Sequence, residues 1–388
     1  MKIIKNIGKI FLVIFIAVNI LIITFGKTYI YKGVANTYLK GRSGPSIDEY
    51  KIFANREVKA GTAKEWAVSK FDNTKKISEE HLQQFVDMGT VAYLIIKNDS
   101  IIHEQYWDGY GANSYSNSFS MAKSFTSMLI GAAIAEGKIK NVDEPVGDFL
   151  PQYKEGDNAK LTIRHLLTMS SGINFDEDYV NPLAYPAAAY YGSDIKKLTY
   201  KYKVTEEPGK NFKYLSGNSE LLGFIIEAAT GKKEADYMAE KVWQPIGAKN
   251  SAYWGLDHED GMEKAYCCFN SNARDFARLG KLYLDTGKYN GKQLIPADYV
   301  LSSIKPADLI DEDGIKNDKY GYAWWLIPNY KGHNIFYARG ILGQYIVCIP
   351  DKKMIVVRLG KKREKRLDNR HPIDLYYYID AALEMYGD

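Results

Sequence analysis

The amino-acid sequence predicts an α/β (α+β) protein in which an antiparallel sheet is flanked by helices and interrupted by an inserted all-helical region. Three observations lead to this prediction. Segments rich in β-branched and aromatic residues lie near both ends of the main part of the chain, segments of helical periodicity lie between them, and an apolar helix closes the chain. Strands from both ends would therefore pair in one sheet, with helices packed on it.

Residues 1–27 are predicted to be a membrane anchor or signal segment. Lysines precede an apolar run over residues 10–25, which is the order of charge and hydrophobicity found in export signals. The run is slightly short for a comfortable span, but only a weak cleavage site follows, at residues 33–35. We favour an uncleaved anchor over a cleaved signal peptide. The remainder would be membrane-anchored or secreted, on the extracytoplasmic (periplasmic) side.

Residues 28–77 are expected to form a stalk and an N-terminal extension, because they contain a cluster of turn-forming residues at 41–45. The main domain is expected over residues 78–388. Ser78 is followed by two glutamates, a pattern that predicts the capped start of a short helix.

The strands of the main domain come in two groups. Residues 90–97 and 101–107 are rich in strand-forming side chains and are separated by a turn, so they predict a β-hairpin. Strand character returns near the C-terminus, over residues 320–326, 334–337, 345–349 and 354–359.

Helical periodicity dominates the middle of the chain. Apolar residues recur at helical spacing after Ser120, and Gly137 is placed to end that helix. The predicted helices cover residues 120–136, 161–169, 219–229, 272–284 and 375–386.

Composition and charge restrict the function classes. The chain has 388 residues, of which 46% are hydrophobic and 25% charged, and its formal net charge is +4; this is ordinary for a globular protein. The charges nearly cancel, so they do not indicate nucleic-acid binding. Cys267, Cys268 and Cys348 fit neither a disulfide framework nor a zinc site. Adjacent cysteines are not expected to bridge, because their geometry is strained.

The first motif that carries chemistry is Ser120-Met121-Ala122-Lys123. Residues three apart share a helix face, so hydroxyl and amine can meet. The start of a helix also favours developing negative charge on the serine. Ser193 and Ser302 begin the same four-residue pattern, but only Ser120 opens a strongly apolar helix. The alternative is a helix-capping serine without catalytic function.

Two further segments complete a candidate site. Tyr214 lies on a loop before a helix, where its phenol can relay a proton between a serine and a leaving group; the alternative is a packing tyrosine. In the segment 338–345, glycines such as Gly340 permit close approach of a ligand to an edge strand. A backbone N–H there could join that of Ser120 in holding an oxyanion. The alternative is a plain connecting turn.

In this order, these segments resemble the serine β-lactamase and penicillin-binding-protein superfamily, in the branch of class C β-lactamases and 6-aminohexanoate-dimer hydrolases. The Ser120 motif alone is weakly specific, whereas the ordered set is strongly specific. The resemblance extends over about residues 80–388, and the segments that carry it are 119–124, 161–172, 208–223, 273–280 and 320–325.

The resemblance implies a β-lactamase/transpeptidase-like fold, with the site between the sheet and the helical region. Ser120 would attack a carbonyl and form an acyl-enzyme that water hydrolyses. Lys123 and Tyr214 would share the acid and base roles, and the backbone N–H groups of Ser120 and Ile341 would form the oxyanion hole. No metal or cofactor is implied. The partners would be a small-molecule or peptide-like substrate and, through the N-terminal segment, the membrane.

Two departures from the resemblance bear on the substrate. Many relatives have Tyr-x-Asn where this chain has Tyr214-Leu215-Ser216, although Ser216 can still donate a hydrogen bond to substrate. Relatives often have Lys-Thr-Gly or His-x-Gly where this chain has Ala338-Arg339-Gly340. The cation that would meet a β-lactam carboxylate is thus missing unless Arg339 replaces it. We expect an amidase, peptidase or esterase, with a true β-lactamase or D-peptidase as the alternative.

Other function classes fit less well. The Gly-x-Ser-x-Gly motif of α/β-hydrolases and the zinc-protease and P-loop motifs are absent from the sequence. A non-catalytic binding or sensor domain of the same fold would not need Ser120, Lys123 and Tyr214 together, although the altered second and third motifs fit it. His165 is expected to form structural hydrogen bonds rather than part of a triad.

Overall fold

The computed structural model describes residues 2–388, with side chains from residue 6 onward. Met1 and the side chains of residues 1–5, which include two of the N-terminal lysines, lie outside the described part. The helices are α1 (Lys2–Thr24), α2 (Tyr29–Asn36), α3 (Glu79–Asp87), α4 (Ala122–Ala135), α5 (Ile163–Leu167), α6 (Tyr185–Tyr191), α7 (Ile195–Thr199), α8 (Ser216–Thr230), α9 (Glu234–Met238), α10 (Ala273–Leu284), α11 (Ala297–Ser303) and α12 (Ile373–Tyr386).

The strands form two sheets and a few short pairs. The strands of the larger sheet are β2 (Ala67–Val68), β3 (Thr90–Lys97), β4 (Ser100–Tyr106), β12 (Trp325–Tyr330), β13 (His333–Gly340), β14 (Gln344–Ile349) and β15 (Met354–Gly360). The smaller sheet contains β1 (Asn55–Val58), β5 (Ser116–Asn117), β7 (Ala252–Gly255) and β8 (Phe269–Ser271). The two-residue strands outside these sheets are β6 (Asn211–Phe212), β9 (Lys288–Tyr289), β10 (Lys292–Gln293), β11 (Ile310–Asp311), β16 (Leu367–Asp368) and β17 (His371–Pro372).

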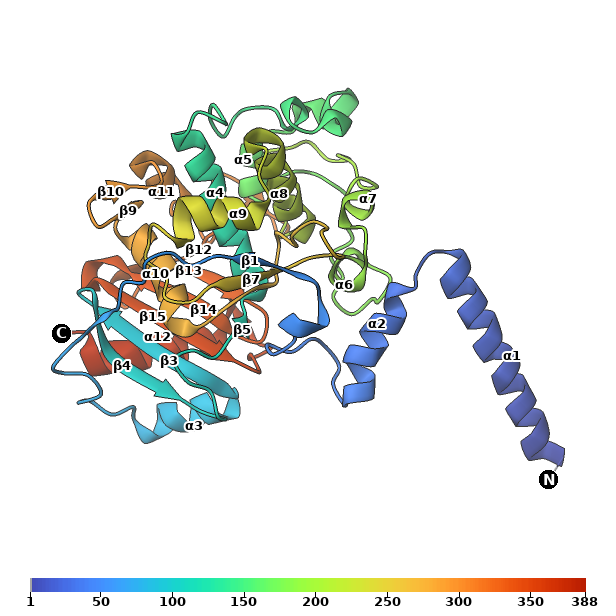
Figure 1. Cartoon of the computed structure of the whole chain (residues 1–388), viewed down its shortest axis with the longest axis horizontal. Helices are drawn as coiled ribbons and strands as arrows, with labels where there is room; N and C mark the ends of the chain where they lie inside the picture. Colours follow the sequence, from blue (N-terminus) through green and yellow to red (C-terminus); the bar gives the residue numbers. More distant parts are fainter. Residues whose placement is uncertain (1) are drawn as a thin grey trace.

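The larger sheet joins strands from both ends of the main domain, as predicted, and adds β2 from the preceding segment. Its order is β12-β13-β14-β15-β3-β4-β2, and every pair is antiparallel except β2 with β4. The central pairing joins β3 to β15, with Leu94 opposite Val357. The predicted fold class is confirmed: Figure 1 shows this sheet with the helical region, α5 to α9, beside it.

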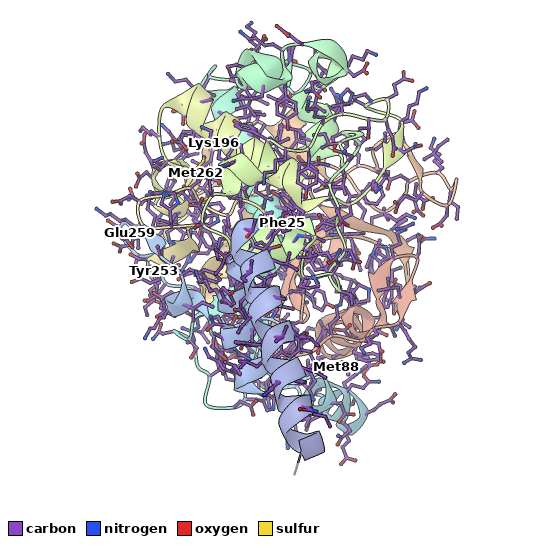
Figure 2. The ribbon with its side chains drawn as sticks, turned by 90° about the vertical axis from the view of Figure 1, so that its right-hand side faces the viewer. Phe25, Met88, Lys196, Tyr253, Glu259 and Met262 are labelled. Atoms are coloured by element: carbon purple, nitrogen blue, oxygen red, sulfur yellow. A yellow bond between two sulfur atoms is a disulfide. The ribbon has the colours of Figure 1, made fainter. Side chains whose placement is uncertain are left out.

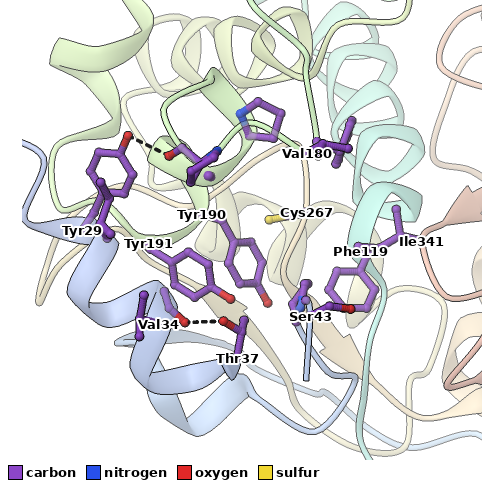
Figure 3. Close-up of a pocket in the computed structure, with 18 of the residues that line it drawn as sticks. Tyr29, Val34, Thr37, Ser43, Phe119, Val180, Tyr190, Tyr191, Cys267 and Ile341 are labelled. Atoms are coloured by element: carbon purple, nitrogen blue, oxygen red, sulfur yellow. Dashed lines mark hydrogen bonds between the residues drawn. The ribbon is translucent and has the colours of Figure 1, made fainter. Parts of the chain in front are cut away.

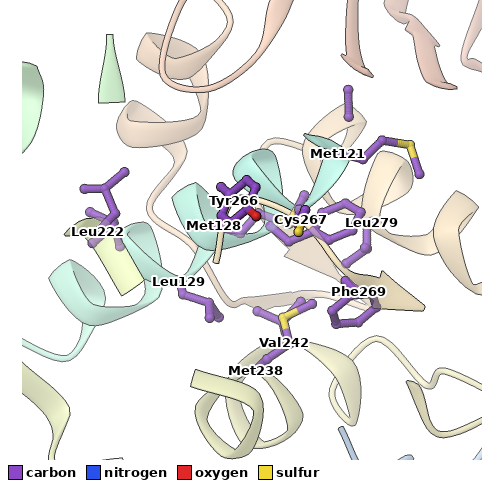
Figure 4. Close-up of a cluster of buried hydrophobic side chains, with 14 of the residues drawn as sticks. Met121, Met128, Leu129, Leu222, Met238, Val242, Tyr266, Cys267, Phe269 and Leu279 are labelled. Atoms are coloured by element: carbon purple, nitrogen blue, oxygen red, sulfur yellow. The ribbon is translucent and has the colours of Figure 1, made fainter. Parts of the chain in front are cut away.

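Each face of the sheet is covered by helices. Because side chains alternate along a strand, Leu94 and Ile96 of β3 join the core that contains α4 and α10, whereas Tyr93 and Ile95 join a second core with α3 and α12. The first core continues into the helical region. Figure 4 shows Met128 and Leu129 of α4 in one cluster with Met238, Val242 and Phe269. Helix α4 therefore links the sheet to the helical region along buried side chains.

Local sequence explains several element ends. The hairpin β3–β4 turns through Asn98 and Asp99, which both have positive φ, as a two-residue turn of type I′ requires. The hydroxyl of Ser78 accepts a hydrogen bond from the N–H of His81 and caps α3. Gly137 has φ of 67° just after α4. The ring of His165 accepts a hydrogen bond from the N–H of Thr162 and completes the cap of α5, which is a structural role.

The strand predicted over residues 320–326 is wrong in its first part, because β12 begins only at Trp325. Ala323 has φ of 59°, and its N–H donates to the carbonyl of Leu167. Residues 320–324 are therefore bonded partly to the helical region instead of the ladder. β13 also lies between β12 and β14, so Gly340 is not on an edge strand as expected.

The expectation that adjacent cysteines stay unbridged is contradicted. Cys267 and Cys268 form a disulfide, and Cys348 is free and buried. Cys268 has φ of 69°, a left-handed conformation that non-glycine residues seldom adopt. The two sulfurs meet within this turn.

Residues 28–77 pack along the main domain. Helix α2 lies against α6, and β1 pairs with β7 in the smaller sheet, whose order is β1-β7-β8-β5. The side chains of Phe53 and Trp66 are buried. The expected extension is therefore in extensive contact with the body.

Helix α1 projects away from the body. Phe25, labelled in Figure 2, directly follows α1, and from there the chain turns towards α2. Over residues Asn6–Thr24 the mean hydropathy is 2.6 and none of this stretch is buried. By length and composition α1 can cross a membrane.

Candidate active site

Ser120 lies at the entry to the buried helix α4. It occupies a 3₁₀ turn, Phe119–Met121, that leads directly into α4. Phe119 has φ of 44°, so the chain turns sharply just before the serine. Ser120 is partly exposed, whereas its neighbours Phe119 and Met121 are buried. The turn thus presents one hydroxyl to the outside of an otherwise closed core.

Lys123 lies one helical turn away and points at Ser120. Its Nζ is 3.0 Å from the Ser120 hydroxyl and donates to the carbonyl of Tyr266, also at 3.0 Å. The side chain is 1% exposed. The Nζ also lies 5.1 Å from the ring centroid of Tyr214 and 5.3 Å from that of Tyr266. The other serines of this pattern, Ser193 and Ser302, are exposed.

Tyr214 joins this group from the loop before α8. Its ring packs on Trp325 at 5.4 Å and edge-on to Tyr320 at 6.0 Å between centroids, and one face is turned towards Lys123. The three side chains predicted as catalytic, Ser120, Lys123 and Tyr214, therefore share one neighbourhood.

The end of β13 lies against the turn that carries the nucleophile. A Cβ on Gly340 would come within 2.2 Å of the Ser118 carbonyl oxygen, so only glycine allows this approach. The next residue, Ile341, lines the same pocket as Ser120. Ile341 is drawn beside Phe119 in Figure 3. Gly340 thus allows the end of β13, next to Ile341, to pack closely on the turn that carries Ser120.

Ser216 is engaged by an acidic residue that sequence reasoning missed. Glu177 accepts hydrogen bonds from the N–H of Ser216, at 2.8 Å, and from its hydroxyl. Tyr179 also lies in this network, bonded to Glu177. Burial raises the pKa of Glu177, while the charge of Lys123 and the bonds from Ser216 oppose the rise. Glu177 lies between two aspartates and reads as a solvated acidic loop, so no sequence signal pointed to it.

The side chain of Arg339 packs on the ring of Trp325. Its guanidinium stacks 3.5 Å from a ring centroid of Trp325 and donates to the carbonyl of Arg370 at 2.7 Å. It is not among the residues lining the pocket at Ser120. A substrate carboxylate would have to compete with the Arg370 carbonyl, and the predicted substrate contact by Arg339 stays a prediction.

The disulfide turn borders the site. Cys267 lines the pocket next to Tyr266, whose carbonyl accepts the hydrogen bond from Lys123. Within residues 2–388, no group of three or more His, Cys, Asp or Glu side chains is arranged to hold a metal ion.

Comparison with known proteins gives the family. The β-lactamase family model matches residues 79–376. The chain is 24% identical over 305 residues to the 6-aminohexanoate-dimer hydrolase of Paenarthrobacter ureafaciens, covering 74% of this chain and 76% of the relative. It is 27% identical over 355 residues to the teichoic acid D-alanine hydrolase of Staphylococcus aureus, covering 84% and 83%.

A solved structure agrees with these relatives. A Bacillus anthracis protein classed as a 6-aminohexanoate-dimer hydrolase superposes with a TM-score of 0.73 at 25% identity, over 87% of this chain and 93% of the other. The family match spans most of the chain, and the serine and lysine of the predicted motif lie in hydrogen-bonding contact. The protein belongs to the β-lactamase family of serine hydrolases.

Proposed function

We propose that this chain hydrolyses an ester or amide bond through an acyl-enzyme on Ser120, with Lys123 and Tyr214 as general base and acid. The observation that carries the proposal is the 3.0 Å contact between the Nζ of the buried Lys123 and the hydroxyl of Ser120, which lines a pocket. The relatives named 6-aminohexanoate-dimer hydrolase and teichoic acid D-alanine hydrolase support a hydrolytic activity.

In the acylation step, Lys123 acts as the neutral amine. Its lone pair takes the proton from Ser120 Oγ while an N–H stays on the Tyr266 carbonyl. The Oγ forms a bond to the substrate carbonyl carbon, and the oxyanion is held by the N–H groups of Ser120 and Ile341. The bond to the leaving group then breaks, and the leaving group takes a proton by way of Tyr214. The acyl group remains on Ser120.

In the deacylation step, a water molecule replaces the leaving group. Lys123 and Tyr214 remove its proton as it attacks the acyl carbon, and Ser120 Oγ leaves with a proton restored. Ser216, held by Glu177, and the backbone beside Gly340 would position the substrate. Because Ala338 is buried and supplies no cation, we favour amides or esters over β-lactams.

We also propose that α1 anchors the protein, with the hydrolase outside the cytoplasm. No other part of the described chain buries the apolar stretch Asn6–Thr24, and exposing these side chains to water would cost free energy. A membrane would cover it.

Labelling of Ser120 tests the proposal. The full chain is incubated with a fluorophosphonate and digested, and the modified peptide is identified by mass spectrometry. We expect the adduct on Ser120 and none in Ser120→Ala, while Ser302→Ala, which removes the exposed serine of a similar pattern, labels as the wild type. A folded chain labelled elsewhere or not at all would leave only a binding or sensor role.

A further inference from the structure

The pocket at the nucleophile extends away from the sheet to the helix that follows α1. Ser120 and Ile341 lie at one end, and Tyr29 and Val34 of α2 at the other, around a volume of about 200 Å³. Figure 3 shows Tyr190 and Tyr191 between these two ends. The space next to the reacting bond is therefore shared between the hydrolase domain and α2.

The walls of this pocket carry no charge. Among the described residues that line it there is no Asp, Glu, Lys, Arg or His side chain. Aromatic and aliphatic groups form most of its surface, including those of Ile30, Val34, Pro186, Ala187 and Tyr190. A charged group placed there would lose its water without gaining a counterion. An alkyl chain would gain from leaving water.

The same pocket lies close to the proposed membrane. Only residues 25–28 separate α1 from α2, and the Tyr29 hydroxyl donates to the Pro182 carbonyl at 3.1 Å. This bond ties α2 to the loop that carries Glu177. Large apolar side chains just after α2 and on this loop are exposed, with Leu39 at 78% and Val180 at 92%. Such exposure on neighbouring segments fits contact with a lipid surface.

We infer that the substrate is an amphiphile with an uncharged alkyl chain next to its scissile ester or amide bond, presented at the membrane surface. The chain lies in the pocket between Ser120 and α2, and the polar part of the substrate stays towards the sheet. This inference rests on the proposed Ser120 hydrolase and names its substrate class. It assigns to α2 the role of a wall of the substrate site.

Chain-length preference tests the inference on the full chain in phospholipid nanodiscs. The probes are p-nitrophenyl acetate, p-nitrophenyl octanoate and octyl acetate, each below its aggregation limit. The second lengthens the acyl side of the bond and the third the alcohol side. Ethyl acetate is added as the short counterpart of octyl acetate. We expect kcat/KM for one of the two eight-carbon substrates to exceed that of its short counterpart by at least about tenfold, the effect of burying roughly two methylene groups.

Two neighbouring substitutions on α2 separate pocket binding from partition into lipid. Val34→Asp introduces a carboxylate into the pocket and is expected to lower the long-to-short ratio at least about fivefold. Ala35→Asp adds the same charge at an exposed position outside the lining and is expected to leave all rates unchanged.

The outcomes distinguish the two proposals. If short esters are hydrolysed and neither eight-carbon substrate is preferred, or if Val34→Asp and Ala35→Asp have equal effects on the ratio, the amphiphile inference is overturned and the hydrolase stands. If no ester is hydrolysed and Ser120 takes no fluorophosphonate, both fall.

Discussion

Lys123 carries a large share of the proposed chemistry. Its side chain is buried, and its Nζ touches the Ser120 hydroxyl and the Tyr266 carbonyl. Lys123→Ala removes the group that takes the serine proton, so kcat/KM on a small ester is expected to fall by about 10²–10⁴. Lys196→Ala is the matched control, since Lys196 belongs to the similar pattern at Ser193 and is exposed. Equal activity of the two variants would remove Lys123 from the mechanism.

Glu220 of α8 is expected to make the stability of the folded protein depend on pH. It is fully buried, and neither carboxylate oxygen has a hydrogen-bond partner among the described residues. Burial, followed by the nearby charges of Glu234 and Asp257, raises the pKa of Glu220 well above its ordinary value. The folded state then binds a proton that the unfolded state releases above about pH 4.5. Stability therefore falls as pH rises from there towards the raised pKa.

Glu220→Gln should remove this loss of stability at high pH, because the glutamine amide stays neutral. We expect its melting temperature to exceed that of the wild type at pH 8 by a few degrees, and by less at pH 5. Differential scanning fluorimetry across this range is the measurement, and Glu206→Gln, an exposed carboxylate, is the control. A variant less stable than the wild type at pH 8 would contradict the prediction.

At the scale of elements, the contact between β13 and the nucleophile turn positions the site. Gly340→Ala would place a Cβ within 2.2 Å of the Ser118 carbonyl oxygen, so strand and turn must separate. We expect both a lower melting temperature and a loss of at least about tenfold in kcat, since small displacements at reacting groups cost activity. Gly111→Ala, with open space around its Cβ position, should be nearly neutral. Unchanged kcat in Gly340→Ala would show that the close contact between β13 and the nucleophile turn is not needed for activity.

Sequence patterns predicted the elements whose periodicity is strong. Residues 90–97 coincide with β3, and the helix expected over residues 272–284 is α10 with Asn272 as its cap. The strand prediction for residues 320–324 was wrong because it relied on their aromatic composition. Their conformation is set by the left-handed backbone of Ala323 and by its hydrogen bond to the Leu167 carbonyl. Such contacts between distant segments have no local signature.

The parts of the site that lie within one short motif could be predicted from the sequence. The parts that depend on contacts between distant segments could not. The spacing of Ser120 and Lys123 on one helix predicted their contact, and the family resemblance added Tyr214. Glu177 reaches Ser216 only because a loop of the helical region folds over α8. The disulfide at Cys267 depends on the backbone conformation of a turn, which composition does not reveal.

At the scale of the whole molecule, α1 stands apart from the folded body. None of the stretch Asn6–Thr24 is buried, so deleting residues 1–27 should cost the body little stability. We expect the shortened chain to move from the membrane fraction to the soluble fraction and to keep its kcat/KM on p-nitrophenyl acetate. Fractionation and steady-state kinetics measure both. A shortened chain that aggregates or loses activity would show that α1 also supports the body.

The pairing of β3 with β15 has a consequence for biogenesis. β3 emerges from the ribosome early, but its partner at residues 354–360 is made much later. Closing so long a loop is slow, and until then one side of β3 is an unpaired apolar edge. A nascent chain would thus depend on chaperones that shield this edge. A stop codon before residue 354 would remove an interior strand of the sheet, and quality-control proteases would clear the product.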